Sequence, residues 1–220
     1  MRALVTGGTG RVGSGIAARL EAEGYRVLAA GRRDGDLSRA DEARALVDRA
    51  ASELGGLDLV VHAAGEGFVP RALEDVTEED WDTALGATAK GSFFVGQACA
   101  PHLRASRGLL VLIEDVAAYQ PWLSFAPHSA AKAAQAMLTR VLARALAPEA
   151  RVCGVAPGPV AVEPEQAERR AAETLLGRVG SPDDVAEAVL YLARAEFVTG
   201  TSLVVDGGRL LVETRRTRDA

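Results

Sequence analysis

A glycine-rich stretch near the start of the chain could bind a phosphate group. Gly7, Gly10 and Gly13 follow the apolar run Ala3–Val5 and open an amphipathic segment. Glycine lets a backbone turn sharply and approach a ligand closely, and the N-terminus of a following helix attracts an anion. Plain tight turns also contain glycine. The order of strand, glycines and helix nevertheless favours a site for the diphosphate of a dinucleotide.

Arginines near this stretch indicate which dinucleotide would bind. An acid at the end of the second strand binds the ribose 2′-hydroxyl of NAD, whereas a basic residue accommodates the 2′-phosphate of NADP. Arg32 and Arg33 stand at that place, and Arg11 lies in the glycine stretch. One such arginine is often a solvated surface residue. Three together favour NADP(H) over NAD(H), with Asp34 and Asp36 as the competing acids nearby.

The elements that would position these residues alternate between short strands and longer helices. Thr77 and Ser181 are expected N-cap residues, and Gly24 is expected just past a helix end. The alternation predicts an α/β fold with a Rossmann-type, doubly wound parallel sheet flanked by helices, in three α/β/α layers. One domain would span residues 1–212, followed by a charged tail at 213–220. Six apolar runs are predicted strands: Ala3–Val5, Arg26–Ala30, Leu57–His62, Leu109–Ile113, Arg151–Val155 and Ser202–Val205.

The composition excludes several classes of protein. The chain has 220 residues, 48% hydrophobic and 25% charged, which is ordinary globular usage. Its net charge of −5 argues against a nucleic-acid partner. Cys99 and Cys153 form neither a disulfide scaffold nor a zinc site, and we expect no metal. No apolar run reaches the ~18 residues that span a bilayer, and a strand-like run follows Met1 and Arg2 directly. We therefore expect no membrane span, no signal peptide and a cytoplasmic location.

From Ala3 to about Gly208 the chain resembles the short-chain dehydrogenase/reductase family. Its glycine stretch is similar to the family's cofactor loop, with Arg11 where the middle glycine often stands. The segment 33–40 is short for the family, so a helix and most of a strand found in many relatives are expected to be missing. The resemblance implies a cofactor site made of Thr6, Gly7, Thr9, Gly10, Arg11, Val12, Gly13, Arg32, Arg33, Asp36, Leu37, Ala63, Ala64, Gly65, Lys132, Pro157, Gly158 and Val160.

The same resemblance implies a catalytic site that departs from the family's pattern. The family transfers a hydride from nicotinamide, and a tyrosine delivers a proton. A lysine one turn later anchors the ribose, a serine holds the substrate oxygen and an asparagine supports a proton relay. The lysine here is Lys132, and i,i+4 spacing puts it on one helix face with residue 128. The tyrosine, serine and asparagine positions hold His128, Asp115 and Thr88.

Asp115 and His128 each allow two interpretations. Pteridine-reductase-like members of the family have an aspartate at the position of Asp115, where it helps to protonate a ring nitrogen, but an acid in a loop can also cap a helix. His128 could donate a proton or simply begin an alanine-rich helix. Its ring nitrogen would lie roughly 2 Å short of a phenol hydroxyl, and Lys132 would disfavour the imidazolium form. A bridging water and the Asp115 carboxylate could answer these objections. Tyr119, the nearest other phenol, lies in a different loop.

The leading hypothesis is an NADP(H)-dependent reductase of a small molecule with a carbonyl or a pteridine-like C=N bond. Lys132, His128 and Asp115 would be its catalytic residues. A reductase for acyl or sugar-like carbonyl compounds is the second hypothesis. A cofactor-binding protein that has lost catalysis, acting as a sensor or an assembly subunit, is the third.

Other residues have plainer interpretations. The helix after His128 has alanines at positions 130, 133, 134, 136 and 143. This helix commonly packs against its symmetry mate in the family, so a homodimer or homotetramer is expected. His62 is expected to pack beside the cofactor and His102 to lie on a helix surface. Arginines at positions 169, 170 and 178, in the expected substrate loop, are predicted to be solvated.

Overall fold

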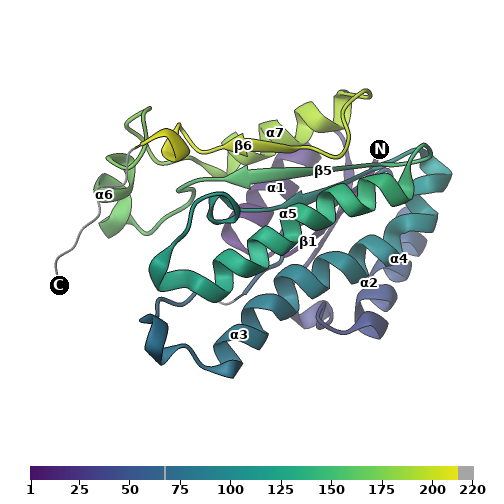
Figure 1. Ribbon diagram of the computed structural model, residues 1–220. Coiled ribbons are helices and arrows are strands. Elements are labelled where there is room, and N and C mark those ends of the chain that lie inside the picture. Colours follow the sequence, from purple (N-terminus) through teal and green to yellow (C-terminus); the bar gives the residue numbers. More distant parts are fainter. Residues whose placement is uncertain (67, 213–220) are drawn as a thin grey trace.

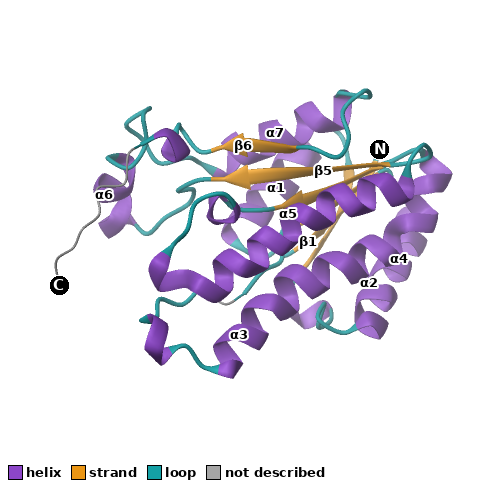
Figure 2. Cartoon of the chain, viewed as in Figure 1, coloured by secondary structure: helices purple, strands orange, loops and turns teal. Residues whose placement is uncertain are grey.

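The computed structural model describes residues 1–66 and 68–212, so the predicted tail at 213–220 lies outside the described residues. Six strands form one sheet in the order β2-β1-β3-β4-β5-β6, and every neighbouring pair is parallel. In Figure 2 the arrows of the last two strands, β5 and β6, run side by side in the same direction. All six predicted strands are present, with ends shifted by two residues at most. Their bounds are β1 (Arg2–Thr6), β2 (Arg26–Ala30), β3 (Leu59–His62), β4 (Leu109–Ile113), β5 (Arg151–Pro157) and β6 (Ser202–Val205).

Helices cover both faces of the sheet and give the predicted three layers (Figure 1). On one face lie α1 (Arg11–Ala22) and α7 (Pro182–Arg194), which pack against each other. On the other lie α2 (Ala40–Leu54), α4 (Gly91–Ser106) and α5 (Ala126–Leu146). The shorter α3 (Glu78–Leu85) packs beside α5, and α6 (Ala167–Ala171) lies in the loop region after β5.

Alternate strand residues point into two separate cores. Leu4 and Leu110 pack against α2, α4 and α5, whereas Val5 and Val111 pack against α1 and α7. All four side chains are fully buried. Strands that are covered on both faces need apolar residues at successive positions. This requirement explains why the strands could be recognised as continuous apolar runs.

The predicted helix boundaries are confirmed. Thr77 Oγ1 accepts a hydrogen bond from the Asp80 amide at 3.1 Å, and the Asp80 carboxylate accepts one from the Thr77 amide. Ser181 and Asp184 make the same reciprocal pair at the start of α7. Gly24 follows α1 with φ of +83°, a conformation that favours glycine.

The connection after β2 is short, as the sequence predicted. Between Ala30 and Ala40 the chain makes only one turn of 3-10 helix, Arg32–Asp34, before α2 begins. No further strand lies beyond β2 within the described residues, so β2 forms one edge of the sheet.

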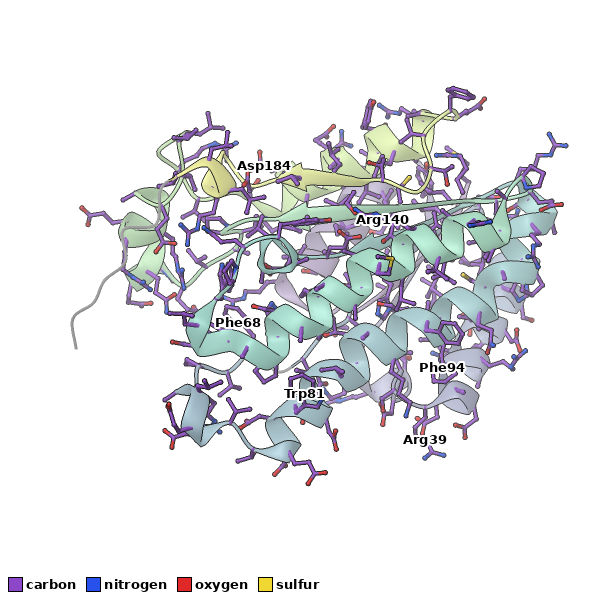
Figure 3. All side chains as sticks on the ribbon, viewed as in Figure 1. Arg39, Phe68, Trp81, Phe94, Arg140 and Asp184 are labelled. Atoms are coloured by element: carbon purple, nitrogen blue, oxygen red, sulfur yellow. The ribbon has the colours of Figure 1, made fainter. Side chains whose placement is uncertain are left out.

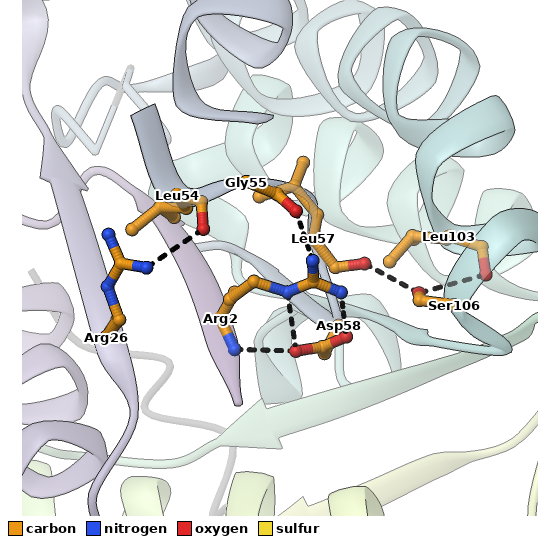
Figure 4. A network of polar contacts seen from close by, with 8 residues as sticks. All are labelled: Arg2, Arg26, Leu54, Gly55, Leu57, Asp58, Leu103 and Ser106. Atoms are coloured by element: carbon orange, nitrogen blue, oxygen red, sulfur yellow. Dashed lines mark hydrogen bonds and ion pairs between the residues drawn. The ribbon is translucent and has the colours of Figure 1, made fainter. Parts of the chain in front are cut away.

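The amino ends of the strands are held by polar contacts on the side away from the glycine loop (Figure 4). Arg2, at the start of β1, makes a bidentate ion pair with Asp58, which precedes β3; the nitrogen–oxygen distances are 3.0 and 2.6 Å. Arg2 also donates to the Gly55 carbonyl. Ser106, at the end of α4, donates to the Leu57 carbonyl at 2.6 Å. These bonds join the starts of neighbouring strands to each other and to the end of α4.

The predicted alanine face of α5 is only partly exposed. Ala136 and Ala143 are 7% and 5% exposed and pack within the protein's own core, so their assignment to an outer face is wrong. The exposed stripe consists of Ala133, Met137 and Val141, spaced four residues apart. The exposed set differs from the predicted one because helix periodicity, not alanine content, decides which side chains face outward. None of the described helices is both long and apolar enough to cross a bilayer.

Candidate active site

The predicted site residues meet in a cleft at the carboxyl ends of the strands, where ligands bind in open α/β sheets. The cleft has a volume of about 880 Å³. Its wall combines the glycine loop, the first turn of α5 and the loop that follows β5. Phe68, at the end of the molecule where the strand arrows finish, belongs to this wall (Figure 3).

The glycine loop leaves a cradle that a diphosphate fits. Gly7 has φ of +69°, and a Cβ atom there would lie 2.6 Å from the Ala63 backbone, so only glycine fits. Gly10 is the N-cap of α1 and gives it no side-chain cap; the first turn contains no acid. The N-terminal amides of α1 therefore lack a side-chain acceptor, and an anion would supply one.

A second space of about 500 Å³ continues the cleft toward the edge of the sheet. The two spaces share Gly7, Gly10, Ala63, Gly65 and Glu66, so a ligand can pass from one to the other. Of the predicted cofactor residues, Arg33 and Pro157 line neither space. Those lining the cleft are Gly7, Gly10, Arg11, Val12, Gly13, Ala63, Gly65, Lys132, Gly158 and Val160; those lining the second space also include Thr6, Thr9, Arg32, Asp36, Leu37 and Ala64.

Arg32 is the basic residue placed beside the second space. Its guanidinium lies 2.7 Å from the Glu66 carboxylate, and 83% of its side chain is exposed. The first acid after β2, Asp34, is held elsewhere. It accepts from the Gly31 amide at 2.9 Å and from Arg49 at 2.8 Å, and it does not line the space. Among the described residues, Asp36 and Glu66 are the carboxylates that line this space, and Glu66 is the one that pairs with Arg32.

Lys132 is buried at the centre of the cleft wall. Its Nζ donates to the Ile113 carbonyl and to Gln135 Oε1, both at 2.9 Å. An ammonium group has three donors, so one N–H remains for a ligand. Burial lowers the pKa of Lys132 below its ordinary value, and the nearby carboxylates of Asp115 and Glu114 oppose that shift.

A chain of hydrogen bonds leads from Lys132 to the asparagine position of the family. Gln135 Nε2 donates to Ser92 Oγ at 2.9 Å, and Ser92 Oγ donates to the Thr88 carbonyl at 2.6 Å. Thr88 lies in a π-helical turn, Gly86–Lys90, of a kind often found at functional sites. Its hydroxyl is buried and has no partner among the described residues. A polar connection therefore joins Lys132 to the Thr88 backbone.

Asp115 caps a turn, which is one of the two interpretations that the sequence left open, and it also lies near His128. One carboxylate oxygen accepts from the Ala117 amide at 2.7 Å and caps the turn Val116–Ala118. The other lies 3.5 Å from His128 Nε2. His128 is in the first turn of α5, so it also begins the alanine-rich helix. Asp115, His128 and Lys132 all line the cleft.

Three aromatic side chains that the sequence analysis missed form a wall around His128. We call Phe68, Trp122 and Phe125 the aromatic wall. Phe68 stacks on Phe125 with ring centroids 4.5 Å apart and meets the His128 ring edge-on at 5.0 Å. Trp122 lies nearly parallel to the His128 ring at 6.3 Å. The three residues lie in loops or short turns, where the sequence has no helix or strand periodicity that would point to them.

A buried carboxylate behind the site was also missed. Glu114 is 2% exposed and accepts hydrogen bonds from Tyr119, Thr139 and Ser202 at 2.8, 2.6 and 2.9 Å. The Tyr119 hydroxyl is therefore engaged by Glu114, and Tyr119 does not line the cleft. These bonds tie together β4, α5 and β6 directly behind Lys132.

Of the other two histidines, His102 lies on a helix surface as predicted, and His62 is buried without lining the cleft or the second space. His62 is fully buried at the end of β3, and its Nδ1 lies 2.8 Å from Thr6 Oγ1. Burial, with a smaller contribution from Lys132, lowers the pKa of His62 to about 4, so the ring is neutral at ordinary pH. His102 lies on α4, 3.2 Å from Asp48 at the surface. The described residues contain no group of three or more His, Cys, Asp or Glu that could hold a metal ion.

Known proteins share this fold and sequence over nearly the whole chain. Residues 29–209 match the family model described as enoyl-(acyl carrier protein) reductase. The chain is 37% identical to a Streptomyces violaceoruber protein named as ketoacyl reductase 2 of the granaticin polyketide synthase, over 96% of each chain. It is 33% identical to 4-formylbenzenesulfonate dehydrogenase TsaC1/TsaC2 of Comamonas testosteroni, over 94% of this chain and 96% of that one.

A solved structure agrees with these matches. The ligand-free aldohexose dehydrogenase of Thermoplasma acidophilum superposes with a TM-score of 0.90 at 24% identity, covering 99% of this chain and 97% of that one. The first relative aligns over 239 positions, more than this chain has residues, so it carries segments that this chain lacks. The chain belongs to the short-chain dehydrogenase/reductase family, a family of oxidoreductases that use nicotinamide cofactors.

Proposed function

We propose that this protein is an NADP(H)-dependent reductase of a carbonyl compound, or of a pteridine-like C=N bond. One observation carries the proposal: Lys132, Asp115 and His128 line the same cleft as the glycine loop. A buried lysine, a proton donor and a diphosphate cradle are what this reaction requires, and all three are in one connected space.

Each of the cleft residues would have a separate role in the reaction. Nicotinamide, when bound, supplies a hydride, which carries two electrons to the substrate carbon. The third N–H of Lys132 would bind the ribose and fix the cofactor's position. His128 would donate a proton to the substrate oxygen or ring nitrogen, and Asp115, at 3.5 Å, would stabilise the protonated ring before transfer. Water from the open cleft would restore the proton.

The relatives' names favour a carbonyl substrate over a pteridine. Ketoacyl and formyl groups, which appear in the names of the two relatives, both contain a carbonyl. Asp115 is the residue that supports the pteridine alternative, because the pteridine-reductase-like branch has an acid there. Screening aldehydes, ketones and dihydropterins with NADPH, by the loss of its absorbance, would separate the two substrate classes.

Cofactor preference rests on Arg32, which lines the space next to β2 and whose partner Glu66 a 2′-phosphate would have to displace. Titrating the protein with NADPH and with NADH, followed by fluorescence, should show tighter binding of NADPH. Arg32→Ala should remove this preference, because a guanidinium is the partner of the 2′-phosphate. Arg33→Ala is the matched control, since Arg33 lines neither space and should leave the preference intact. Equal binding of both nucleotides by the unaltered protein would contradict the NADP assignment.

Catalysis is tested by two substitutions in α5. Lys132→Met should abolish turnover, because it removes the buried ammonium while retaining an apolar stem of similar length. His128→Tyr restores the family's residue. If the unaltered protein binds NADPH tightly but reduces no substrate, and His128→Tyr gains a large ketone-reducing activity, the protein is a cofactor-binding subunit that has lost catalysis. Three changed positions out of the four predicted are what favours that alternative.

We also propose that the protein forms a homodimer or homotetramer in the cytoplasm. Exposed apolar side chains lie along the helical layer: Trp81 in α3, Phe93 in α4, and Met137 and Val141 in α5 are 44%, 38%, 53% and 49% exposed. A stripe of this kind is typical of a contact between copies. Light scattering after size-exclusion chromatography would test it, and a change of Met137 to Glu should shift the population toward monomer.

A further inference from the structure

The cleft has a charged end that the proposed reaction does not use. Arg169, Arg170 and Arg209 line it together with Glu173. We call these three arginines the arginine cluster. They come from α6 and from the turn Arg209–Leu211 that follows β6, so two distant segments of the chain meet here.

The cluster carries more positive charge than the described residues around it neutralise. Glu173 is the carboxylate that all three arginines approach: Arg170 lies 3.0 Å from it, Arg209 3.5 Å and Arg169 3.7 Å. One carboxylate cannot satisfy three guanidinium groups, which have five donors each. By contrast, Arg11 at the glycine loop has Glu163 to itself at 2.7 Å.

Two of the three arginines are also largely buried, so water does not replace the missing carboxylate partners. The side chains of Arg170 and Arg209 are only 21% and 12% exposed, so water solvates them poorly. The Arg209 guanidinium makes no hydrogen bond to any described residue at ordinary distances, only the long contact with Glu173. The sequence prediction of solvated arginines holds for Arg169, at 63%, but is wrong for Arg170. A poorly solvated and underpaired guanidinium favours an anionic partner.

The aromatic wall supplies the second half of the argument. Phe68 and Trp122 border the same cleft, and Phe68 is 53% exposed although it is a large apolar side chain. The Trp122 indole nitrogen is buried and has no hydrogen-bond partner among the described residues. Offset or edge-on contact with these rings is favourable for a flat aromatic ligand.

We infer that the substrate is a planar aromatic carbonyl compound that bears an anionic group, with its ring against the aromatic wall and its anion at the arginine cluster. This inference rests on the proposed function, because it assumes that the carbonyl is presented to His128 and Asp115. The cleft of about 880 Å³ would hold the nicotinamide end of the cofactor as well as the substrate, so it suits a compact substrate. A carboxylate is the simplest anion that a guanidinium binds in bidentate fashion.

The test compares two aldehydes, 4-formylbenzoate and its methyl ester, in which a methyl group removes the negative charge. Each is titrated calorimetrically into the protein, both with and without bound NADP⁺, which cannot reduce them. The carboxylate should bind about tenfold more tightly than the ester, as expected for a charge-assisted hydrogen bond. In the variant Arg170→Gln/Arg209→Gln this preference should disappear while the ester's affinity stays unchanged.

Arg44→Gln is the matched control. Arg44 is exposed on α2, so this substitution removes a positive charge at a place away from the cleft. It should keep the full preference. Equal affinity of the two aldehydes for the unaltered protein, failure of both to bind, or a preference that survives in the double variant would each overturn the inference. Unchanged affinity for the ester shows that the double variant is folded.

Turnover with NADPH separates this inference from the proposed function. Equal reduction of both aldehydes would support the reductase and refute the anionic substrate. Selective binding of the carboxylate with no reduction of either aldehyde would support the anion site and count against the reductase. Selective reduction of the carboxylate would support both.

Discussion

The stability of this protein should depend on pH through His62. The ring is fully buried between the sheet and the helical layer, and burial together with Lys132 lowers its pKa from 6.5 to about 4. When the protein unfolds, the ring reaches water and regains its ordinary pKa. Between these two values the unfolded chain therefore binds a proton that the folded chain does not.

The sign and size of the effect follow from this difference. Because the unfolded state binds more protons, the free energy of unfolding decreases as the pH falls through the window from 6.5 to about 4. Each pKa unit is equivalent to about 1.4 kcal/mol, so the full window amounts to about 3 kcal/mol. Above pH 6.5 the ring is neutral in both states and contributes no pH dependence.

Urea unfolding of the unaltered protein and of His62→Gln, at a series of pH values, measures this contribution. Other titrating groups are common to both proteins, so they cancel in the difference between the two free energies. We expect the unaltered protein to lose about 3 kcal/mol relative to the variant across the window. His102→Gln, which removes a surface histidine, is the control. Parallel pH profiles for the unaltered protein and His62→Gln would refute the reasoning.

Three further substitutions test the fold and the glycine loop. Leu110→Ala should lower the free energy of unfolding by about 2–5 kcal/mol in urea, because Leu110 is fully buried and leaves a cavity; no loss would contradict its place in the core. Ser181→Ala should cost about 1 kcal/mol in the same assay, because the amide of Asp184 loses its cap at the start of α7. Gly13→Ala should weaken NADPH binding at least tenfold in a fluorescence titration, because its Cβ would run into the Gly7 carbonyl. Gly10→Ala is the milder comparison, with its nearest contact at 3.2 Å; equal effects of the two glycine variants would show that the close packing is unimportant.

Most of the fold could be predicted because its strands and helix ends depend on local sequence patterns. A strand such as Leu109–Ile113 is apolar at every position, since both of its faces are covered by helices. Thr77 and Ser181 mark helix starts by chemistry that depends on only four neighbouring residues. The short connection after β2 could be predicted because the segment 33–40 has fewer residues than is usual in the family. Such features need no knowledge of distant contacts.

The site was only partly predictable because it depends on the paths of the loops, which bring together residues that are far apart in the sequence. Arg32 and Arg33 are adjacent in sequence, but only Arg32 lines the space beside β2, since the backbone turns between them. The aromatic wall joins Phe68 to residues more than fifty positions later, and no periodicity connects them. Arg209 reaches the cleft from the far end of the chain. Contacts of this kind follow from the tertiary structure alone.

The three residues predicted to be catalytic are compatible with one another in the structure, which supports the proposed reductase over a protein that has lost catalysis. A histidine is shorter than a tyrosine, and here it lies beside a carboxylate, Asp115, that a serine could not supply. Lys132 remains buried with two hydrogen bonds in place, although a buried ammonium without a function would be costly to keep. Thr88 keeps its backbone carbonyl in the hydrogen-bond chain from Lys132, so the loss of an asparagine side chain there does not break the connection. A buried lysine with two hydrogen bonds, a histidine 3.5 Å from an acid and a hydrogen-bond chain behind them fit a working site, so we expect these residue types to suit a particular substrate.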